Sequence, residues 1–264
     1  MVPGRETGPV IAPMTNYLIV GTYRTGSSAL AELLGLRPDI TCGWESTRRL
    51  PWTRKLRTAE ELFAGDFRKL EPREREFLER MHHPGKRAIG FRVLFRSSDK
   101  WLFHPRTAPG LWLDRLEGHI RWLSRRRPDV HVIHLLRRDN LRWLRSLYLA
   151  KASGVYFGSA YPETLRISIN TGAACRRILT KRWITARLRT LAATNPYTEV
   201  VYEDFLRDNA GVARGLVAFL GCDTEAAPVR PPELGVQSAR TSAQVINIDE
   251  LAAELERRGL LTDP

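Results

Sequence analysis

The sequence predicts an α/β protein in which helices flank a central parallel β-sheet within a single domain. Short apolar runs of strand type alternate along the chain with stretches of helical periodicity. The length of 264 residues is sufficient for one large α/β domain and short for two. We expect residues 1–16 to form an N-terminal extension and residues 17–264 to form the domain.

The chain begins with an apolar strand and a helix. Residues 17–21 (Tyr-Leu-Ile-Val-Gly) form a short apolar run that ends at glycine, as a buried strand does. In residues 27–36 the leucines fall on one face of a helix, and residues 40–42 are strand-like. Residues 46–87 are polar, basic and rich in helix breakers, and within them a helix is expected only at 73–81.

The middle of the chain repeats this alternation. Residues 88–94 are apolar enough for a second buried strand. Residues 111–127 carry leucine and isoleucine at helical spacing, and Pro128 ends that helix. Residues 131–136 predict a further strand, followed by a helix at 139–150.

The last third follows a glycine-containing loop. Residues 164–194 predict a long helix, and residues 198–202 predict a strand. Residues 211–220 predict a helix that ends at the following glycine, and residues 248–257 predict the last helix. Strands that alternate with helices in this way are typical of a parallel sheet with helices on both faces.

The composition narrows the function classes. The formal net charge of +13 comes mostly from arginine, which suits nucleic acid, an anionic membrane surface or an anionic cofactor. No run approaches 18 apolar residues, and residues 1–13 lack the apolar core of a signal peptide, so we expect neither a membrane span nor export. Cys42, Cys175 and Cys222 lack metal-ligand spacing, and a cytoplasmic location is therefore expected.

Residues 21–28 (Gly-Thr-Tyr-Arg-Thr-Gly-Ser-Ser) lie between a predicted strand and a predicted helix. This is the context of a phosphate-binding loop, in which backbone N–H groups and the helix N-terminus converge on an anion. Compared with the nucleotide-binding pattern G-x-x-x-x-G-K-[ST], Ser27 occupies the lysine position and Arg24 supplies a cation within the loop. The loop therefore suits a nucleotide with one 5′-phosphate joined to a small transferable anion. The alternative is a tight turn that binds no ligand.

The segment Arg24-Thr-Gly-Ser-Ser28 after a Tyr-Leu-Ile-Val-Gly strand resembles the 5′-phosphosulfate loop of sulfotransferases that use 3′-phosphoadenosine-5′-phosphosulfate (PAPS). Its arginine form is similar to the carbohydrate-directed and bacterial branches, which include the trehalose and nodulation-factor enzymes. The resemblance implies a P-loop-like strand–loop–helix that binds PAPS. The loop residues that it implies are Arg24, Thr25, Gly26, Ser27, Ser28 and Ala29.

Residues 131–146 resemble the second signature of this family. There, an arginine after a strand and a serine eight residues later bind the 3′-phosphate, and Arg138 and Ser146 have that spacing. Eight residues are just over two helical turns, which returns the serine towards the arginine. Arg137 takes the role of Arg138 if the strand is offset by one residue. The alternative is a basic helix face without a ligand.

Two weaker segments follow in family order. Residues 200–206 and 219–221 are similar to a third block, which implies that Tyr202 lies near the adenine. A tyrosine that caps the sheet edge is the alternative. Residues 237–242 resemble the segment that folds over the 3′-phosphate, which implies a role for Arg240. A surface loop is the alternative there.

Transfer of a sulfonate to a hydroxyl calls for a general base that removes the acceptor's proton. In carbohydrate-directed relatives a glutamate placed as Glu45 is proposed for this role, so the resemblance implies Glu45; simple pairing with Arg48 or Arg49 is the alternative. Other branches use a histidine, which makes His119 the second candidate base. No metal is implied, because Arg24 and Arg138 supply the positive charge locally.

Together these segments predict a PAPS-dependent sulfotransferase that releases PAP and acts by in-line displacement on a small-molecule or carbohydrate acceptor. A carbohydrate or a glycosylated metabolite is the expected acceptor on resemblance alone. The first rival is a P-loop kinase of small molecules, against which the Ser27 substitution counts. The second is a nucleic-acid binder, for which the sequence offers charge but no recognised motif.

Overall fold

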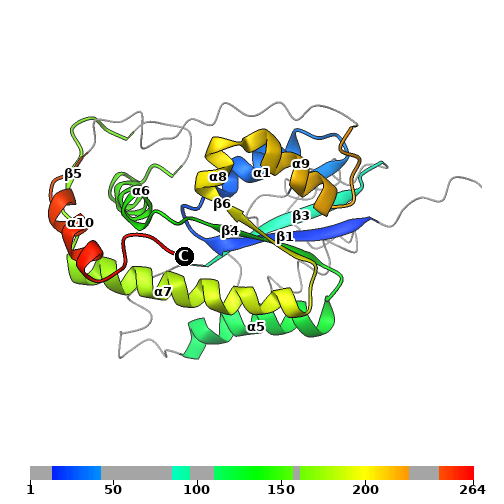
Figure 1. The fold of residues 1–264 in the computed structure, drawn as a ribbon, viewed down its shortest axis with the longest axis horizontal. Helices are drawn as coiled ribbons and strands as arrows, with labels where there is room; N and C mark the ends of the chain where they lie inside the picture. Colours follow the sequence, from blue (N-terminus) through cyan, green and yellow to red (C-terminus); the bar gives the residue numbers. More distant parts are fainter. Residues whose placement is uncertain (1–13, 43–84, 96–109, 157–160, 226–243) are drawn as a thin grey trace, which may run out of the picture.

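The computed structural model describes residues 14–42, 85–95, 110–156, 161–225 and 244–264, with only the backbone at residues 110–115. Within these ranges the chain forms a five-stranded sheet with helices on both faces, and a two-stranded sheet at one end (Figure 1). The predicted α/β class with a central parallel sheet flanked by helices is confirmed.

The five strands of the main sheet are all parallel and have the order β2-β3-β1-β4-β6. Their bounds are β1 (Thr15–Thr22), β2 (Ile40–Cys42), β3 (Ala88–Phe95), β4 (His131–Leu136) and β6 (Tyr197–Val201). Strand β1 lies in the middle, where Ile19 pairs with Arg92 on one side and with Ile133 on the other. Because both faces are covered, the central strands are continuous apolar runs rather than alternating ones.

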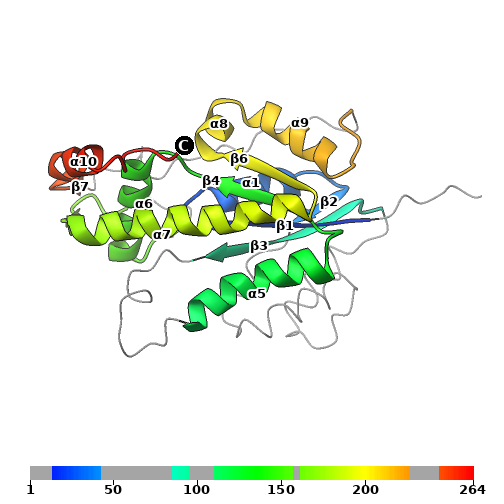
Figure 2. The ribbon, with the colours of Figure 1, turned by 60° about the horizontal axis from the view of Figure 1, so that its bottom comes forward.

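Helices pack against both faces of this sheet (Figure 2). One face is covered by α1 (Ser27–Gly35), α8 (Tyr202–Arg207) and α9 (Asn209–Phe219). The other is covered by α5 (Gly110–Arg126), α7 (Thr171–Arg189) and the short 3-10 helix at Thr190–Ala193. Beyond the sheet, α6 (Asn140–Ser153) and α10 (Ile248–Arg257) pack on the first half of α7 and enclose a separate apolar cluster.

The loop after β1 lies where the strand order of the sheet reverses, because later strands are added first on one side of β1 and then on the other. From β1 the chain passes to β2 and β3 on one side of the sheet, and it then crosses to β4 on the other side. Parallel strands end at the same edge, and ligands of such folds bind at this edge beside the switch in strand order. The loop after β1 and the turn after β4 therefore meet at the expected binding edge.

Two predicted boundaries are wrong for local reasons. The helix predicted at 164–194 begins only at Thr171, because Asn170 caps it by accepting a hydrogen bond from the N–H of Ala173. Residues 166–167 instead form β5 (Arg166–Ile167), which pairs with β7 (Gln244–Val245). Strand β6 ends at Val201, so Tyr202 is the first residue of α8 rather than the end of a strand. The helix predicted at 73–81 lies outside the described residues.

None of the helices that the structure describes is long and apolar enough to cross a membrane.

Candidate active site

The loop between β1 and α1 has the backbone geometry of an anion cradle. Arg24 has φ 66° and Gly26 has φ 90°, both in the left-handed region. The left-handed conformation costs a non-glycine residue such as Arg24 about 1–2 kcal/mol. Alternation of right- and left-handed residues turns successive N–H groups towards one point, which is how backbone nests bind anions. Strain of this kind persists where the surroundings enforce it.

The loop carbonyls are held from inside the protein. The indole Nε1 of Trp143 donates to the carbonyl of Tyr23 at 2.9 Å, and Nη1 of Arg137 donates to the carbonyl of Arg24 at 3.0 Å. In a trans peptide the N–H points opposite to the carbonyl. The N–H groups of Arg24 and Thr25 therefore point away from Trp143 and Arg137.

Helix α1 starts directly after this cradle. In the described chain no side chain caps its N-terminus, because the preceding residue is Gly26. The first N–H groups of a helix need partners, and together with the helix dipole they favour an anion. Ser28 lies in this first turn and accepts a hydrogen bond from Nη1 of Arg92 at 2.8 Å. The helix start therefore combines N–H donors, a hydroxyl and a buried guanidinium.

Tyr202 closes the loop from the side of α8. A Cβ atom added to Gly26 would stand 2.4 Å from Cδ2 of the Tyr202 ring, so only glycine fits there. The guanidinium of Arg137 lies 4.7 Å from the centre of the same ring. The structure thus places Tyr202 against the loop glycine and under Arg137, and its expected contact with adenine stays a prediction.

The side chain of Arg24 joins the loop to α6 and to the segment that follows it. Its Nε donates to the hydroxyl of Ser146 at 3.0 Å, and its Nη1 donates to the carbonyl of Tyr156 at 2.6 Å. Its Nη2 donates to the hydroxyl of Tyr161 at 3.1 Å, and Tyr161 is itself buried. Arg24 and Ser146, which come from two different sequence signatures, are therefore brought together.

Arg137 and Arg138, the two sequence candidates for binding the 3′-phosphate, lie in different environments. Arg137 is only 6% exposed, and its Nε is buried without a hydrogen-bond partner among the described residues. Burial lowers the pKa of Arg137, although an arginine stays charged in proteins. Arg138 is exposed, and its backbone N–H donates to Glu203 at 3.0 Å. Arg137 therefore holds the first loop, while Arg138 faces solvent.

The remaining predicted residues are distributed as follows. Glu45 and Arg240 lie outside the described residues. His119 is buried on α5 and meets Phe95, the last residue of β3, edge-on at a ring separation of 5.5 Å. Ser27 and Thr25 are buried in the loop, where the Thr25 hydroxyl donates to the carbonyl of Thr22 at 2.7 Å.

Sequence reasoning missed several residues of this site. Arg92 could have been found, because it is a charged residue inside an otherwise apolar strand of the predicted sheet. Trp143 and Tyr161, both buried, gave no comparable signal of a contact with the loop after β1. Their contacts with the loop at Tyr23 and Arg24 join positions more than 100 residues apart.

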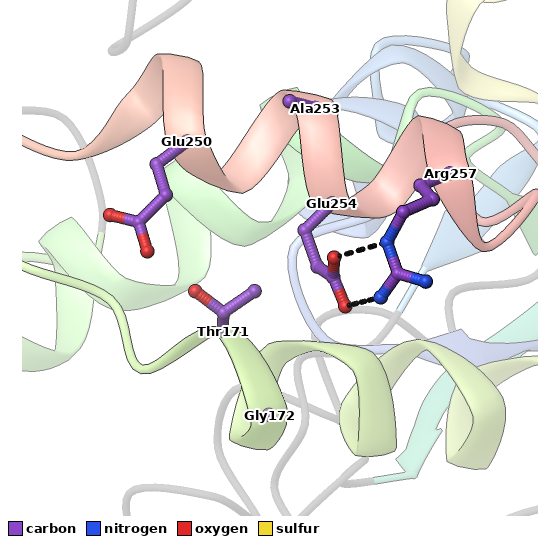
Figure 3. A pocket seen from close by; sticks show the side chains of 6 residues that line it. All are labelled: Thr171, Gly172, Glu250, Ala253, Glu254 and Arg257. Carbon is purple, nitrogen blue, oxygen red and sulfur yellow. Dashed lines mark hydrogen bonds and ion pairs between the residues drawn. The ribbon is translucent and has the colours of Figure 1, made fainter.

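A cavity of about 450 Å³ lies elsewhere, between the start of α7 and α10 (Figure 3). Thr171 and Gly172 line it from α7, and Glu250 and Glu254 line it from α10. Glu254 is paired with Arg257 beside it. Two carboxylates do not favour an anionic nucleotide, so this cavity is no part of the candidate active site.

The chain is similar to known proteins in sequence and in structure. The chain matches the sulfotransferase family over residues 17–226. A comparison with curated protein sequences gives no match. Among solved structures, the chain is similar to a sulfotransferase from Alicyclobacillus acidocaldarius, with 17% identity, a TM-score of 0.47 and coverage of 96% of this chain and 98% of the other. It is also similar to a sulfotransferase from Mycobacterium avium, with 14% identity, a TM-score of 0.45 and coverage of 93% and 77%.

The family match includes the loop after β1, the turn after β4 and the start of α8, which are the three segments that meet at the candidate site. The chain is thus an enzyme that belongs to the sulfotransferase family.

Proposed function

We propose that this sulfotransferase moves a sulfonate group from PAPS to a hydroxyl of a small-molecule or carbohydrate acceptor and releases PAP. The family implies the donor. The observation that carries the proposal is the loop after β1, in which Trp143 and Arg137 hold two carbonyls so that the N–H groups of Arg24 and Thr25 point away from these two side chains. Ser27 at the usual lysine position argues against a triphosphate as the ligand.

The residues present fit a nucleotide with several anionic groups. Among the described residues, the buried Nε of Arg137 has no hydrogen-bond partner and no side chain caps the start of α1, and both features favour an anion at the loop. In the proposal, residues 24–29 bind the 5′-phosphosulfate through their N–H groups and through the hydroxyls of Ser27 and Ser28. Arg138 and Ser146 bind the 3′-phosphate, Tyr202 lies beside the adenine, and Arg240 covers the 3′-phosphate.

PAPS supplies an activated sulfonate, whose bond to the 5′-phosphate oxygen breaks as the acceptor oxygen bonds to sulfur. Glu45 accepts the acceptor's proton in this proposal, and His119 is the second candidate for that role. The charge of Arg24, fixed by its bonds to Ser146, Tyr156 and Tyr161, stabilises the negative charge that grows on the phosphate. A preorganised cation of this kind acts without reorganisation during the reaction.

A carbohydrate or a glycosylated metabolite is the proposed acceptor, on the resemblance of the Arg24 loop to carbohydrate-directed sulfotransferases. A cytoplasmic site of action is part of the proposal and is supported by Cys42, Cys175 and Cys222, which are buried and form no disulfide among the described residues.

The proposal is tested by incubating the enzyme with sulfur-labelled PAPS and a panel of carbohydrate and glycoside acceptors. We expect label to appear in at least one acceptor together with an equal amount of PAP. Thermal denaturation provides the comparison of nucleotides, and PAP should raise the melting temperature more than ATP does. A larger shift with ATP, and turnover that depends on magnesium, would instead indicate a P-loop kinase.

A further inference from the structure

Lys181, in the middle of α7, is a buried charge that the proposed reaction does not use. It is 2% exposed, and its ammonium makes three polar contacts. Its Nζ lies 2.5 Å from the carbonyl of Arg137, 2.5 Å from Oδ1 of Asn140 and 2.7 Å from Oδ2 of Asp263. An ammonium has three donors, so all three are used. Burial lowers the pKa of Lys181, and the nearby carboxylate of Asp263 opposes that shift.

These contacts belong to a network that holds every residue of the turn between β4 and α6. The bonds are Lys181 Nζ to the Arg137 carbonyl, the Arg138 and Asp139 N–H groups to the Glu203 carboxylate, the Asp263 N–H to the Arg138 carbonyl, and the Asn140 N–H to the Leu261 carbonyl. The amide of Asn140 also donates to Asp263 at 2.8 Å, which joins two of the partners of Lys181. The turn that carries Arg137 and Arg138 is therefore fixed from α7, α8 and residues 260–263.

Lys181 also contacts Trp143, one of the two side chains that hold the carbonyls of the loop after β1. Its Nζ lies 5.0 Å from the centre of the Trp143 ring, within the range of a cation–π interaction. The indole N–H of Trp143 donates to the carbonyl of Tyr23. A single ammonium thus contacts the turn after β4 directly and the loop after β1 through one side chain.

Stability alone is a poor reason for this arrangement. Removing a lysine and a carboxylate from water costs several kcal/mol per ion, and apolar side chains of similar volume often stabilise a core equally well. What an apolar side chain cannot do is fix the direction of a carbonyl. Lys181 binds the backbone carbonyl of Arg137. The guanidinium of the same residue donates to the carbonyl of Arg24 at 3.0 Å.

We propose that Lys181 is a positioning residue of the donor site, and this inference rests on the proposed function. Its ammonium orients the turn at residues 137–140, so that Arg137 reaches the first loop and Arg138 faces the 3′-phosphate of the donor. Lys181 touches no substrate in this account. It acts through the backbone of Arg137, the amide of Asn140 and the ring of Trp143.

The test uses Lys181→Met, which keeps the length of the side chain and removes its donors. At a temperature where parent and variant are both folded, the Kd for PAP should rise at least tenfold. The Kd for AMP, which lacks the 3′-phosphate, should rise less, so the preference for PAP over AMP falls. Lys181→Gln, which retains an amide donor, serves as a second variant and should give a smaller shift in the same direction.

Arg37→Met is the matched control. Arg37 is also a buried cation, bonded to Asp39 at 2.8 Å and to the carbonyl of Asp223 at 2.8 Å, next to the amino ends of β2 and β3. Its loss should lower the melting temperature but leave the preference for PAP over AMP within twofold of the parent. If Lys181→Met and Lys181→Gln behave as Arg37→Met does, Lys181 is a structural residue and the inference is overturned.

Amide hydrogen exchange without nucleotide separates this inference from the proposed function. In Lys181→Met, peptides that cover residues 137–143 and 22–27 should exchange faster than in the parent, whereas Arg37→Met should leave them unchanged. A parent that fails to bind PAP contradicts the proposed function. Unchanged exchange at these two segments in Lys181→Met contradicts the positioning role.

Discussion

Replacing Gly26 by alanine probes the loop with the smallest possible change. At φ 90° the added Cβ would stand 2.4 Å from Cδ2 and 2.6 Å from Cε2 of Tyr202. Ordinary contact begins at 3.4 Å, so the ring and the loop must move apart by about 1 Å. The left-handed backbone adds a cost of about 1–2 kcal/mol. Gly26→Ala should therefore distort both the loop and the stacking of Arg137 on Tyr202.

The expected magnitude can be separated into two parts. The backbone cost alone lowers the melting temperature by roughly 2–4 °C per kcal/mol for a domain of this size. The displaced ring also loosens Arg137, whose guanidinium donates a hydrogen bond to the Arg24 carbonyl. Hydrogen bonds to charged groups contribute about 1.5–3 kcal/mol. Since about 1.4 kcal/mol corresponds to a tenfold change, the Kd for PAP should rise at least tenfold.

Gly221→Ala is the control for the backbone part. Gly221 has φ 69° at the end of α9, and among the described residues its added Cβ would meet only Thr15 Oγ1, at 3.9 Å. Both variants are compared with the parent by thermal denaturation and by calorimetric titration with PAP. Gly221→Ala should be less stable but bind PAP normally. If Gly26→Ala also binds PAP within twofold of the parent, the loop after β1 is not where the nucleotide phosphate binds.

Four further results are expected. Glu45→Gln should abolish turnover and leave PAP binding almost unchanged; turnover within about threefold of the parent rules out Glu45 as the base. Arg138→Met should raise the Kd for PAP at least tenfold but the Kd for AMP less than threefold in paired titrations, and equal increases would show that Arg138 does not bind the 3′-phosphate. EDTA should leave turnover in the labelled-PAPS assay intact, whereas strict magnesium dependence would contradict the account. Burial lowers the pKa of His134 to about 4, although Glu199 lies 3.7 Å away. As the pH falls below about 6.5, the unfolded chain therefore takes up a proton at His134 before the folded chain does, and the folded state loses stability. Urea unfolding should show about 2 kcal/mol less stability at pH 5 than at pH 7, and His134→Gln should reduce this difference.

The sequence was informative wherever local pattern determines structure. Strand β4 and helix α10 begin and end at the predicted residues, because a short continuous apolar run and an amphipathic helical period are both local patterns of the sequence. The combination of a strand, two glycines and a helix start predicts a tight strand–loop–helix, and the structure has this form with a left-handed Gly26; phosphate binding there stays a prediction.

The sequence was uninformative wherever structure depends on distant partners. Strands β5 and β7 are two residues each and exist only because residues 166–167 and 244–245 pair with one another. The contact of Trp143 with Tyr23 joins positions 120 residues apart, and no motif announces it. The different roles of Arg137 and Arg138 follow from where β4 ends, and a one-residue shift would exchange the buried and the exposed guanidinium.

In the proposed function, the loop after β1 binds the 5′-phosphate of an adenosine nucleotide that also carries a 3′-phosphate. Calorimetric titration of the purified enzyme with PAP, AMP and ATP tests it most directly. We predict one PAP bound per chain, with a Kd at least tenfold lower than that for AMP or ATP. The absence of binding heat and of thermal stabilisation with PAP, or tighter binding of ATP, would contradict the account.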